Sequence, residues 1–256
     1  MAWDSDGTDG RRLYNATFAP LNGSAGPFTI CGWFRSDSTT QTDKYLFQAH
    51  QLNVANQQWA VIYEYVNNTV EFFADGFTGT DPRTSSGLTV ADTSWHHLAY
   101  RKGASGASTW DKFLDGTKTA ISASIDFTLP STLNDFTVLG AAAGTTPTFA
   151  NSPNGKIGPV AIWNVSLSDD EVASLARRQS ASRIRPGSQV AYFEMLGRSP
   201  EPELSGAALA LTNTDCTVAD HPPLAPAFGF LGGWQGGFTA AAAAVKRFLS
   251  LLNVGT

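Results

Sequence analysis

The chain has 256 residues, of which 15% are charged, and its formal net charge is −5 at pH 7. Because the chain is mildly acidic and has no long run of Lys or Arg, we expect neither nucleic acid nor an anionic membrane surface as a partner. The 24 glycines, 13 prolines and 11% aromatic residues are typical of short strands and tight turns around an aromatic core.

The N-terminal segment is acidic and lacks the basic and apolar regions of a signal peptide, so we expect no secretion signal. Residues 4–10 read DSDGTDG and combine three carboxylates with two flexible glycines. Ca²⁺ binds hard oxygen ligands that such loops supply, although the spacing is not that of an EF-hand. A calcium loop and a solvated turn are both compatible with this segment.

From residue 28 to about residue 164, side chains alternate with the period of two that strands require. Trp59, Val61 and Tyr63 fall on one face of such a strand. Ala60 and Ile62 fall on the other. The pattern predicts strands at 28–35, 44–50, 58–66, 69–75, 95–102, 111–115, 117–121, 135–140 and 156–164, followed by two more at 189–194 and 207–211.

A short helix is predicted after the strand at 156–164. Ser168 and Glu171 have the spacing of a capping box, in which each side chain satisfies the other residue's backbone N–H. Val172, Leu175 and Ala176 then form an apolar stripe. We expect this helix to cover one edge or end of a sheet.

Three segments carry a family resemblance: SWHHLAYRK (94–102), KFLDG (112–116) and NGKIGPVAIWNVSLSDDEV (154–172). In these the chain resembles the laminin-G-like and concanavalin A-like lectin/glucanase jelly-roll family. The tail that follows, through residues 219–223, is similar to phage and environmental bacterial members of that family. The resemblance implies an all-β fold, a two-sheet antiparallel jelly-roll sandwich with one short helix after the sandwich core. We expect this domain to occupy residues 1–221.

Residues 222–256 form a Gly/Ala-rich apolar C-terminal arm, without a charged residue between 222 and 245. Glycines and Pro226 argue against a membrane span, and a terminal helix is predicted at 240–253. The arm would dock either on its own sandwich or on a neighbouring subunit, and both alternatives stay open. The candidate assembly residues are Phe228, Phe230, Leu231, Trp234, Phe238, Val245, Phe248, Leu249 and Leu252.

Signatures of catalysis are missing from the sequence. His96 and His97 are adjacent on a predicted strand, so they point to opposite faces and cannot serve one metal or substrate. The resemblance implies a structural role for this pair. Retaining glycoside hydrolases need two carboxylates that flank the scissile bond, and Glu64, Glu71 and Asp75 do not have that spacing. We therefore predict that the chain is not an enzyme.

Calcium is the cofactor that the resemblance suggests. The family's opening segment and the loop before its strand at 156–164 would bring together Asp6, Asp9 and Asn154 as ligands. Gly10 and Gly158 depart from the family pattern at positions where an Asp is common. A solvated N-terminal turn is the alternative.

Glycan binding usually requires an aromatic platform beside polar groups. Trp110 follows the flexible loop 103–109, and Phe149 lies in a loop rich in Gly, Pro and Thr. Each is a candidate stacking surface for a sugar. Each could equally belong to the rim of the core.

The leading functional hypothesis is a non-catalytic binding or assembly module, a phage virion structural protein that decorates a capsid or associates with a tail. Its partners would be other virion or self subunits, contacted through the arm, and its location the extracellular particle. A carbohydrate-binding, lectin-like bacterial protein is the second hypothesis. A glycoside hydrolase of the same fold is the third.

Overall fold

The computed structural model describes residues 1–222 except 40, 42, 52–53, 55–56, 65–68, 83–86, 91, 104–109, 120–125, 144–147 and 207–208, and it does not describe the side chains of 64 and 142–150. The chain divides into two compact units, Met1–Pro223 and Leu224–Thr256. The second unit, with all nine candidate assembly residues and the helix predicted at 240–253, lies outside the described residues.

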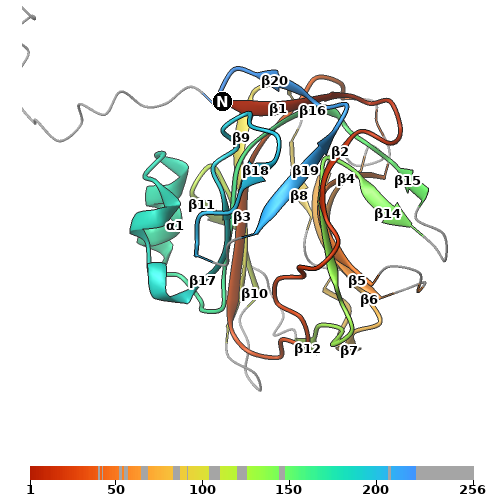
Figure 1. Ribbon diagram of the computed structural model, residues 1–256. Helices are drawn as coiled ribbons and strands as arrows, with labels where there is room; N and C mark the ends of the chain where they lie inside the picture. The colour runs from red at the N-terminus through yellow and green to blue at the C-terminus, as the bar shows by residue number, and fades with distance from the viewer. Residues whose placement is uncertain are drawn as a thin grey trace, which may run out of the picture. The chain divides into compact units, whose positions relative to one another are not determined.

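Two eight-stranded antiparallel sheets face each other (Figure 1). The first, sheet A, contains in spatial order β11 (Thr117–Thr119), β10 (Trp110–Leu114), β9 (Trp95–Lys102), β3 (Phe28–Ser36), β16 (Asn154–Trp163), β1 (Ala2–Asp6) and β20 (Thr217–Ala219), and β17 (Gln189–Phe193) also pairs with β16. The second, sheet B, contains β18 (Glu201–Pro202), β19 (Ala210–Thr214), β2 (Arg12–Asn15), β13 (Asp135–Val138), β4 (Lys44–His50), β5 (Gln58–Glu64), β6 (Thr69–Asp75) and β8 (Leu88–Thr89).

Two small strand pairs lie beside the sheets: β7 (Thr78–Gly79) with β12 (Phe127–Thr128), and β14 (Ala141–Ala143) with β15 (Thr148–Ala150). The predicted all-β sandwich of two antiparallel sheets is confirmed. Strand boundaries differ from the predicted ones by a few residues at most for β3, β4, β6, β9 and β16.

The core between the sheets is aromatic. Trp59, Val61 and Tyr63 of β5 are fully buried there, as the alternation predicted. Phe72 of β6 stacks on Trp59 with ring centroids 6.0 Å apart and meets Trp110 of sheet A edge-on at 5.1 Å. Large rings thus bridge the two layers, which gives aromatic pairing beyond simple burial of area.

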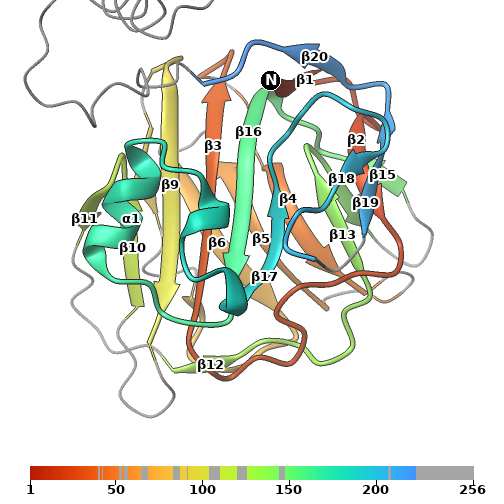
Figure 2. The same ribbon diagram turned by 60° about the vertical axis from the view of Figure 1, so that its left-hand side comes forward.

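Helix α1 (Asp169–Ala176) packs on the outer face of sheet A, followed by the 3₁₀ turns η3 (Ala181–Arg183) and η4 (Pro186–Ser188) (Figure 2). The predicted capping box is present: Ser168 Oγ accepts from Glu171 N at 3.2 Å, and Ser168 N donates to Glu171 Oε2 at 2.6 Å. Val172 and Leu175 are buried in a second apolar cluster with sheet A residues that include Trp163. Among the described residues, no helix is long and apolar enough to cross a membrane.

The two adjacent histidines of β9 have different surroundings. His97 is buried against Trp33 with ring centroids 5.4 Å apart, and burial lowers its pKa to about 4. His96 is clamped between carboxylates, Nδ1 at 2.8 Å from Asp115 Oδ2 and Nε2 at 3.0 Å from Asp92 Oδ1. The hydrogen bond with Asp115, more than any other contact, raises the pKa of His96. Both side chains are engaged within the fold.

Candidate functional site

A turn at one end of the sandwich connects β1 to β2. Gly7 and Gly10 have φ of 83° and 97°, conformations that other residues rarely adopt. Asp6 Oδ1 accepts a hydrogen bond from Thr8 N at 3.0 Å, which tightens the turn and, ahead of any other contact, lowers the pKa of Asp6. The conformation of this turn therefore sets the positions of Arg11 and Arg12, which follow Gly10.

A second turn, between β19 and β20, lies beside the first. Asn213 Oδ1 accepts from Cys216 N, and Asn213 Nδ2 donates to Cys216 O, both at 3.0 Å. Asp215 adopts φ of 56°, the left-handed region that Asp and Asn tolerate better than most residues. These bonds hold the carboxylate of Asp215 at the exposed tip of the turn.

Arg11 joins the two turns. Its Nη1 donates to Asp215 O at 3.0 Å, and its Nη2 lies 3.0 Å from Asp6 Oδ2. Arg11 Nε is buried and has no hydrogen-bond partner. Arg12 Nη1 donates to Gly10 O at 2.6 Å. The guanidinium of Arg11 is thus preorganised by bonds to both turns, and these two bonds use only part of its five N–H donors.

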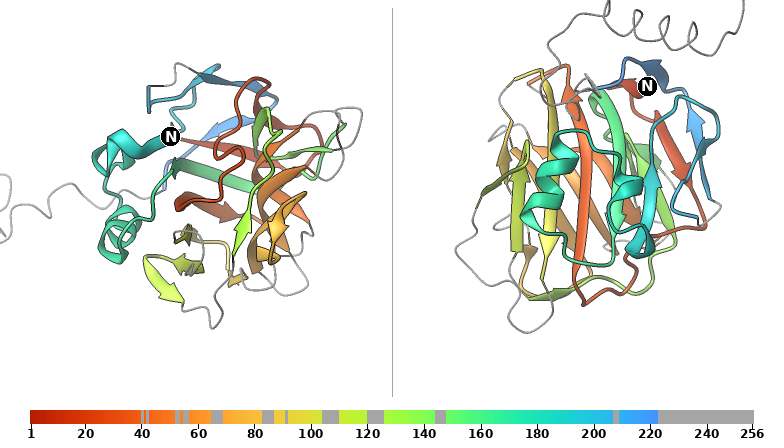
Figure 3. Two further views of the ribbon diagram at one scale, coloured as in Figure 1. Left: turned by 90° about the horizontal axis from the view of Figure 1, so that it is seen from below. Right: turned by 90° about the vertical axis from the view of Figure 1, so that its left-hand side faces the viewer.

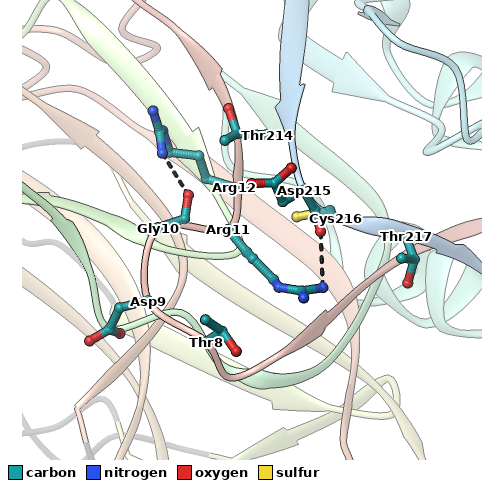
Figure 4. A pocket seen from close by; sticks show the side chains of 9 residues that line it. All are labelled: Thr8, Asp9, Gly10, Arg11, Arg12, Thr214, Asp215, Cys216 and Thr217. Carbon is teal, nitrogen blue, oxygen red and sulfur yellow. Dashed lines mark hydrogen bonds between the residues drawn. The ribbon is translucent and has the colours of Figure 1, made fainter.

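Between the two turns lies a cavity of about 660 Å³ that is open to solvent (Figure 4). This volume falls within the range of small-molecule sites, roughly 300–1,000 Å³. Its formal charges cancel, because two arginines face two aspartates. The lining offers hydroxyl, carboxylate and guanidinium groups from Thr8, Asp9, Gly10, Arg11, Arg12, Thr214, Asp215, Cys216 and Thr217.

Cys216 contributes no reactive thiolate to this cavity. Its side chain is buried, and that burial raises the thiol pKa to about 12. A thiol with such a pKa is protonated at neutral pH and is a weak nucleophile and metal ligand. The cavity is therefore equipped for hydrogen bonding.

A family model with the description "Concanavalin A-like lectin/glucanases superfamily" matches residues 6–173. The chain belongs to this superfamily. The match runs from the end of β1 into α1, so the jelly-roll prediction is confirmed. No curated protein matches the chain.

Solved structures share the fold at low sequence identity. A Bacteroides ovatus protein assigned to carbohydrate binding is 11% identical with a TM-score of 0.56, over 86% of this chain and 59% of that one. The chain thus spans under two thirds of that protein's length. A heptameric SAP-like pentraxin from Limulus polyphemus is 13% identical with a TM-score of 0.44, over 68% of this chain and 78% of that one.

The prediction that the chain is not an enzyme is wrong, because the superfamily to which the chain belongs includes enzymes. The superfamily description itself names glucanases, which are enzymes. Missing carboxylate spacing in the sequence was too narrow a criterion for a fold that carries both lectins and enzymes.

Two of the three predicted calcium ligands come together. Asp6 and Asn154 are paired across β1 and β16, whereas Asp9 lies 3.8 Å from Lys44 Nζ. Asp6 is paired with Arg11 and Asp9 with Lys44, so both carboxylates already have cationic partners. Across the described part of the chain, no group of three or more His, Cys, Asp or Glu side chains could hold a metal. Calcium binding stays a prediction.

One of the two predicted aromatic platforms needs correction. Trp110 is 1% exposed and stacks on Tyr100 at 5.8 Å between ring centroids, so it has no face to offer a sugar. Alternation along β10 places Trp110 in the core between the sheets and Phe113 in the cluster on the outer face of sheet A. Phe149 lies in β15, paired with Ala142 of β14, and its side chain is outside the described residues.

Sequence analysis did not single out Arg11, Arg12, Asp215 or Thr217, which line the cavity. Their turns lie about 200 residues apart in the sequence, and only the pairing of β1 with β20 and of β2 with β19 brings them together. The available signals were local: glycines at 7 and 10, and the Asn-Thr-Asp run at 213–215, both typical of tight turns.

Proposed function

We propose that this protein binds a saccharide in the cavity between the β1–β2 and β19–β20 turns. The observation that carries the proposal is the cavity's lining, in which acceptors and donors converge from two fixed turns. Membership in a lectin/glucanase superfamily supports it. The similar Bacteroides ovatus structure, itself assigned to carbohydrate binding, is consistent with the same ligand class.

Sugar hydroxyls donate and accept hydrogen bonds at once, so a binding site needs both kinds of partner. The carboxylates of Asp9 and Asp215 accept from hydroxyls, and both side chains are solvent-exposed. Arg11 and the threonine hydroxyls donate. Hydrogen bonds to charged groups are stronger than neutral ones, about 1.5–3 kcal/mol each. Because the charges of the lining cancel, an uncharged sugar suits the cavity better than an acidic one.

A glycan array followed by calorimetry tests the proposal with the double variant Asp9→Asn/Asp215→Asn. Asn tolerates the left-handed conformation at 215, so the fold should persist while two charged acceptors are lost. We expect the affinity for the best array sugar to fall about tenfold or more. The matched control is Asp170→Asn/Asp220→Asn, which makes the same charge change at exposed positions outside the cavity.

Equal affinity of the two double variants, or no array sugar bound by the unaltered protein, would contradict the proposal. The same experiment, repeated with calcium and with a chelator, tests the predicted calcium site. If the predicted ligands hold calcium, affinity and melting temperature should both fall on adding a chelator. Unchanged values in calcium and in chelator would remove the cofactor from the proposal.

A structural role in a phage virion is the second candidate function, with the extracellular particle as location. One sequence observation favours it, the run of residues 222–245 without a charge, which is suited to an apolar contact between subunits. We expect deletion of residues 224–256 to convert an oligomer into monomers, as measured by mass in solution. An assembly state unchanged by the deletion would remove this role.

A further inference from the structure

We infer that the saccharide chain continues out of the cavity across the outer face of sheet A and ends on Trp95. This inference rests on the proposed function of the cavity and adds the length and path of the ligand. It assigns a second binding element, the track, defined as Thr217, Asp4, Lys156, Arg35 and Trp95.

The strand register places these five residues in one row. Asp4 pairs with Thr217 on one side and with Lys156 on the other. Arg35 then pairs with Lys156 and with Trp95. Directly opposite residues of paired strands share a face of the sheet. Thr217 also lines the cavity, so the row begins where the cavity opens.

The row lies on the face of sheet A that points away from the core. Phe34 and Ile157, the neighbours of Arg35 and Lys156 in their strands, are buried between the sheets. Side chains alternate along a strand, so Arg35 and Lys156 point outward. Helix α1 covers sheet A further along β9 and β3 and leaves their ends at Trp95 and Ser36 beyond it (Figures 2 and 3).

The dimensions of the track suit an oligosaccharide. Four strand-to-strand steps separate Thr217 from Trp95, and at about 4.8 Å per step the row is roughly 19 Å long. One monosaccharide in the cavity cannot reach Trp95, whereas a short chain can. The ligand class is therefore an oligosaccharide or polysaccharide, held at one end by the cavity.

Ion pairs hold the polar side chains of the track in place. Lys156 Nζ lies 3.2 Å from Asp4 Oδ2 and also bonds Asp37. Arg35 Nε lies 3.1 Å from Asp37 Oδ1, but neither atom has a hydrogen bond of good geometry. With Asp37 beside the row, the two cations Lys156 and Arg35 are balanced by two carboxylates, so this part of the outer face has no net charge. This arrangement offers fixed donors and acceptors to an uncharged chain.

Trp95 is the aromatic end of the row, and it is partly exposed. Trp33 lies on the same face, two residues before Arg35, but its ring is covered. Arg178 Cζ lies 5.1 Å from the centroid of the Trp33 ring, and Trp33 is only 8% exposed. A partly exposed indole can stack on the apolar face of a sugar ring. Trp95 therefore performs the role that the sequence analysis gave to Trp110.

Calorimetry with a length series of the best array sugar, from monosaccharide to pentasaccharide, tests the inference. For the unaltered protein we expect affinity to rise with length up to the chain that reaches Trp95. Trp95→Ala should lower the affinity for the longest chain roughly five- to tenfold and leave that for the monosaccharide unchanged. Trp95→Phe should restore most of the loss, because it retains a ring that stacks.

The outcomes separate this inference from the proposed function. If affinity does not rise with the length of the saccharide, or if Trp95→Ala does not change the affinity for the longest chain, the inference of the track is overturned. The proposed binding in the cavity would still stand. An equal loss for the monosaccharide and the longest chain also overturns the track, because Trp95 would then act on the whole fold. Failure of every sugar to bind overturns the cavity and the track together.

Discussion

Glu201→Ala should unfold the protein at much lower urea concentration than the unaltered chain. The carboxylate is fully buried and accepts four hydrogen bonds. Its donors are Trp3 Nε1 at 2.9 Å and the backbone N–H groups of Leu196 at 2.6 Å, Gly197 at 3.0 Å and Arg198 at 3.2 Å. Truncation leaves these donors without an acceptor, and each donor that stays buried costs about 1–3 kcal/mol of stability. Because water will reach some of the loop, we expect a loss of roughly 3–5 kcal/mol in the free energy of unfolding.

The position matters because Glu201 ties β1 of sheet A to the segment after β17. β1 in turn carries Asp4 and Asp6, so a loosened β1 would also disturb the cavity and the track. Asp220→Ala, an exposed carboxylate, is the control and should change stability by less than about 0.5 kcal/mol. A Glu201→Ala variant as stable as this control would show that the four bonds contribute nothing net.

Arg101→Met should be the second strongly destabilising change, with a loss of about 3–5 kcal/mol measured by urea unfolding. Arg101 is buried on the outer face of sheet A, beneath the start of α1. Its guanidinium bonds Asp111 Oδ2 (Nε at 3.0 Å), Leu167 O (Nη1 at 2.5 Å) and Asp169 Oδ1 (Nη2 at 2.7 Å). Removing it leaves the buried charge of Asp111 with Lys118, whose Nζ lies 3.2 Å away, as its remaining cationic partner among the described residues.

Pairing Arg101→Met with Asp111→Leu should recover much of this loss, because an unpaired buried charge costs more than an apolar pair of similar volume. Arg101→Lys should not recover it, since an ammonium cannot make three divergent bonds in one plane. If the double variant is no more stable than Arg101→Met alone, the cost arises from lost packing of α1 and not from the stranded carboxylate.

Much of the fold followed from local patterns in the sequence. The strict alternation from Trp59 to Tyr63 decided both the strand and its buried face. The Ser168–Glu171 spacing located the start of α1 within one residue. Such features depend on neighbours within a few residues, so a single sequence contains them.

What escaped prediction depends on contacts between distant segments. β1 and β2 have only five and four residues, rich in polar side chains, and they are strands because β16, β20, β13 and β19 pair with them. The cavity inherits that dependence, as its two turns meet only through these pairings. Trp110 was misjudged because the Gly- and Ser-rich sequence before it suggested exposure, whereas pairing of β10 with β9 places its ring in the core.

A crystal structure with a bound tetrasaccharide chosen from the array would test the central claim most directly. The account predicts a terminal sugar between the two turns, with hydroxyls bonded to Asp215 and Arg11, and a chain that runs over Lys156 toward Trp95. A saccharide bound elsewhere, for example on the outer face of sheet B, with the cavity between the turns holding only solvent, would contradict it.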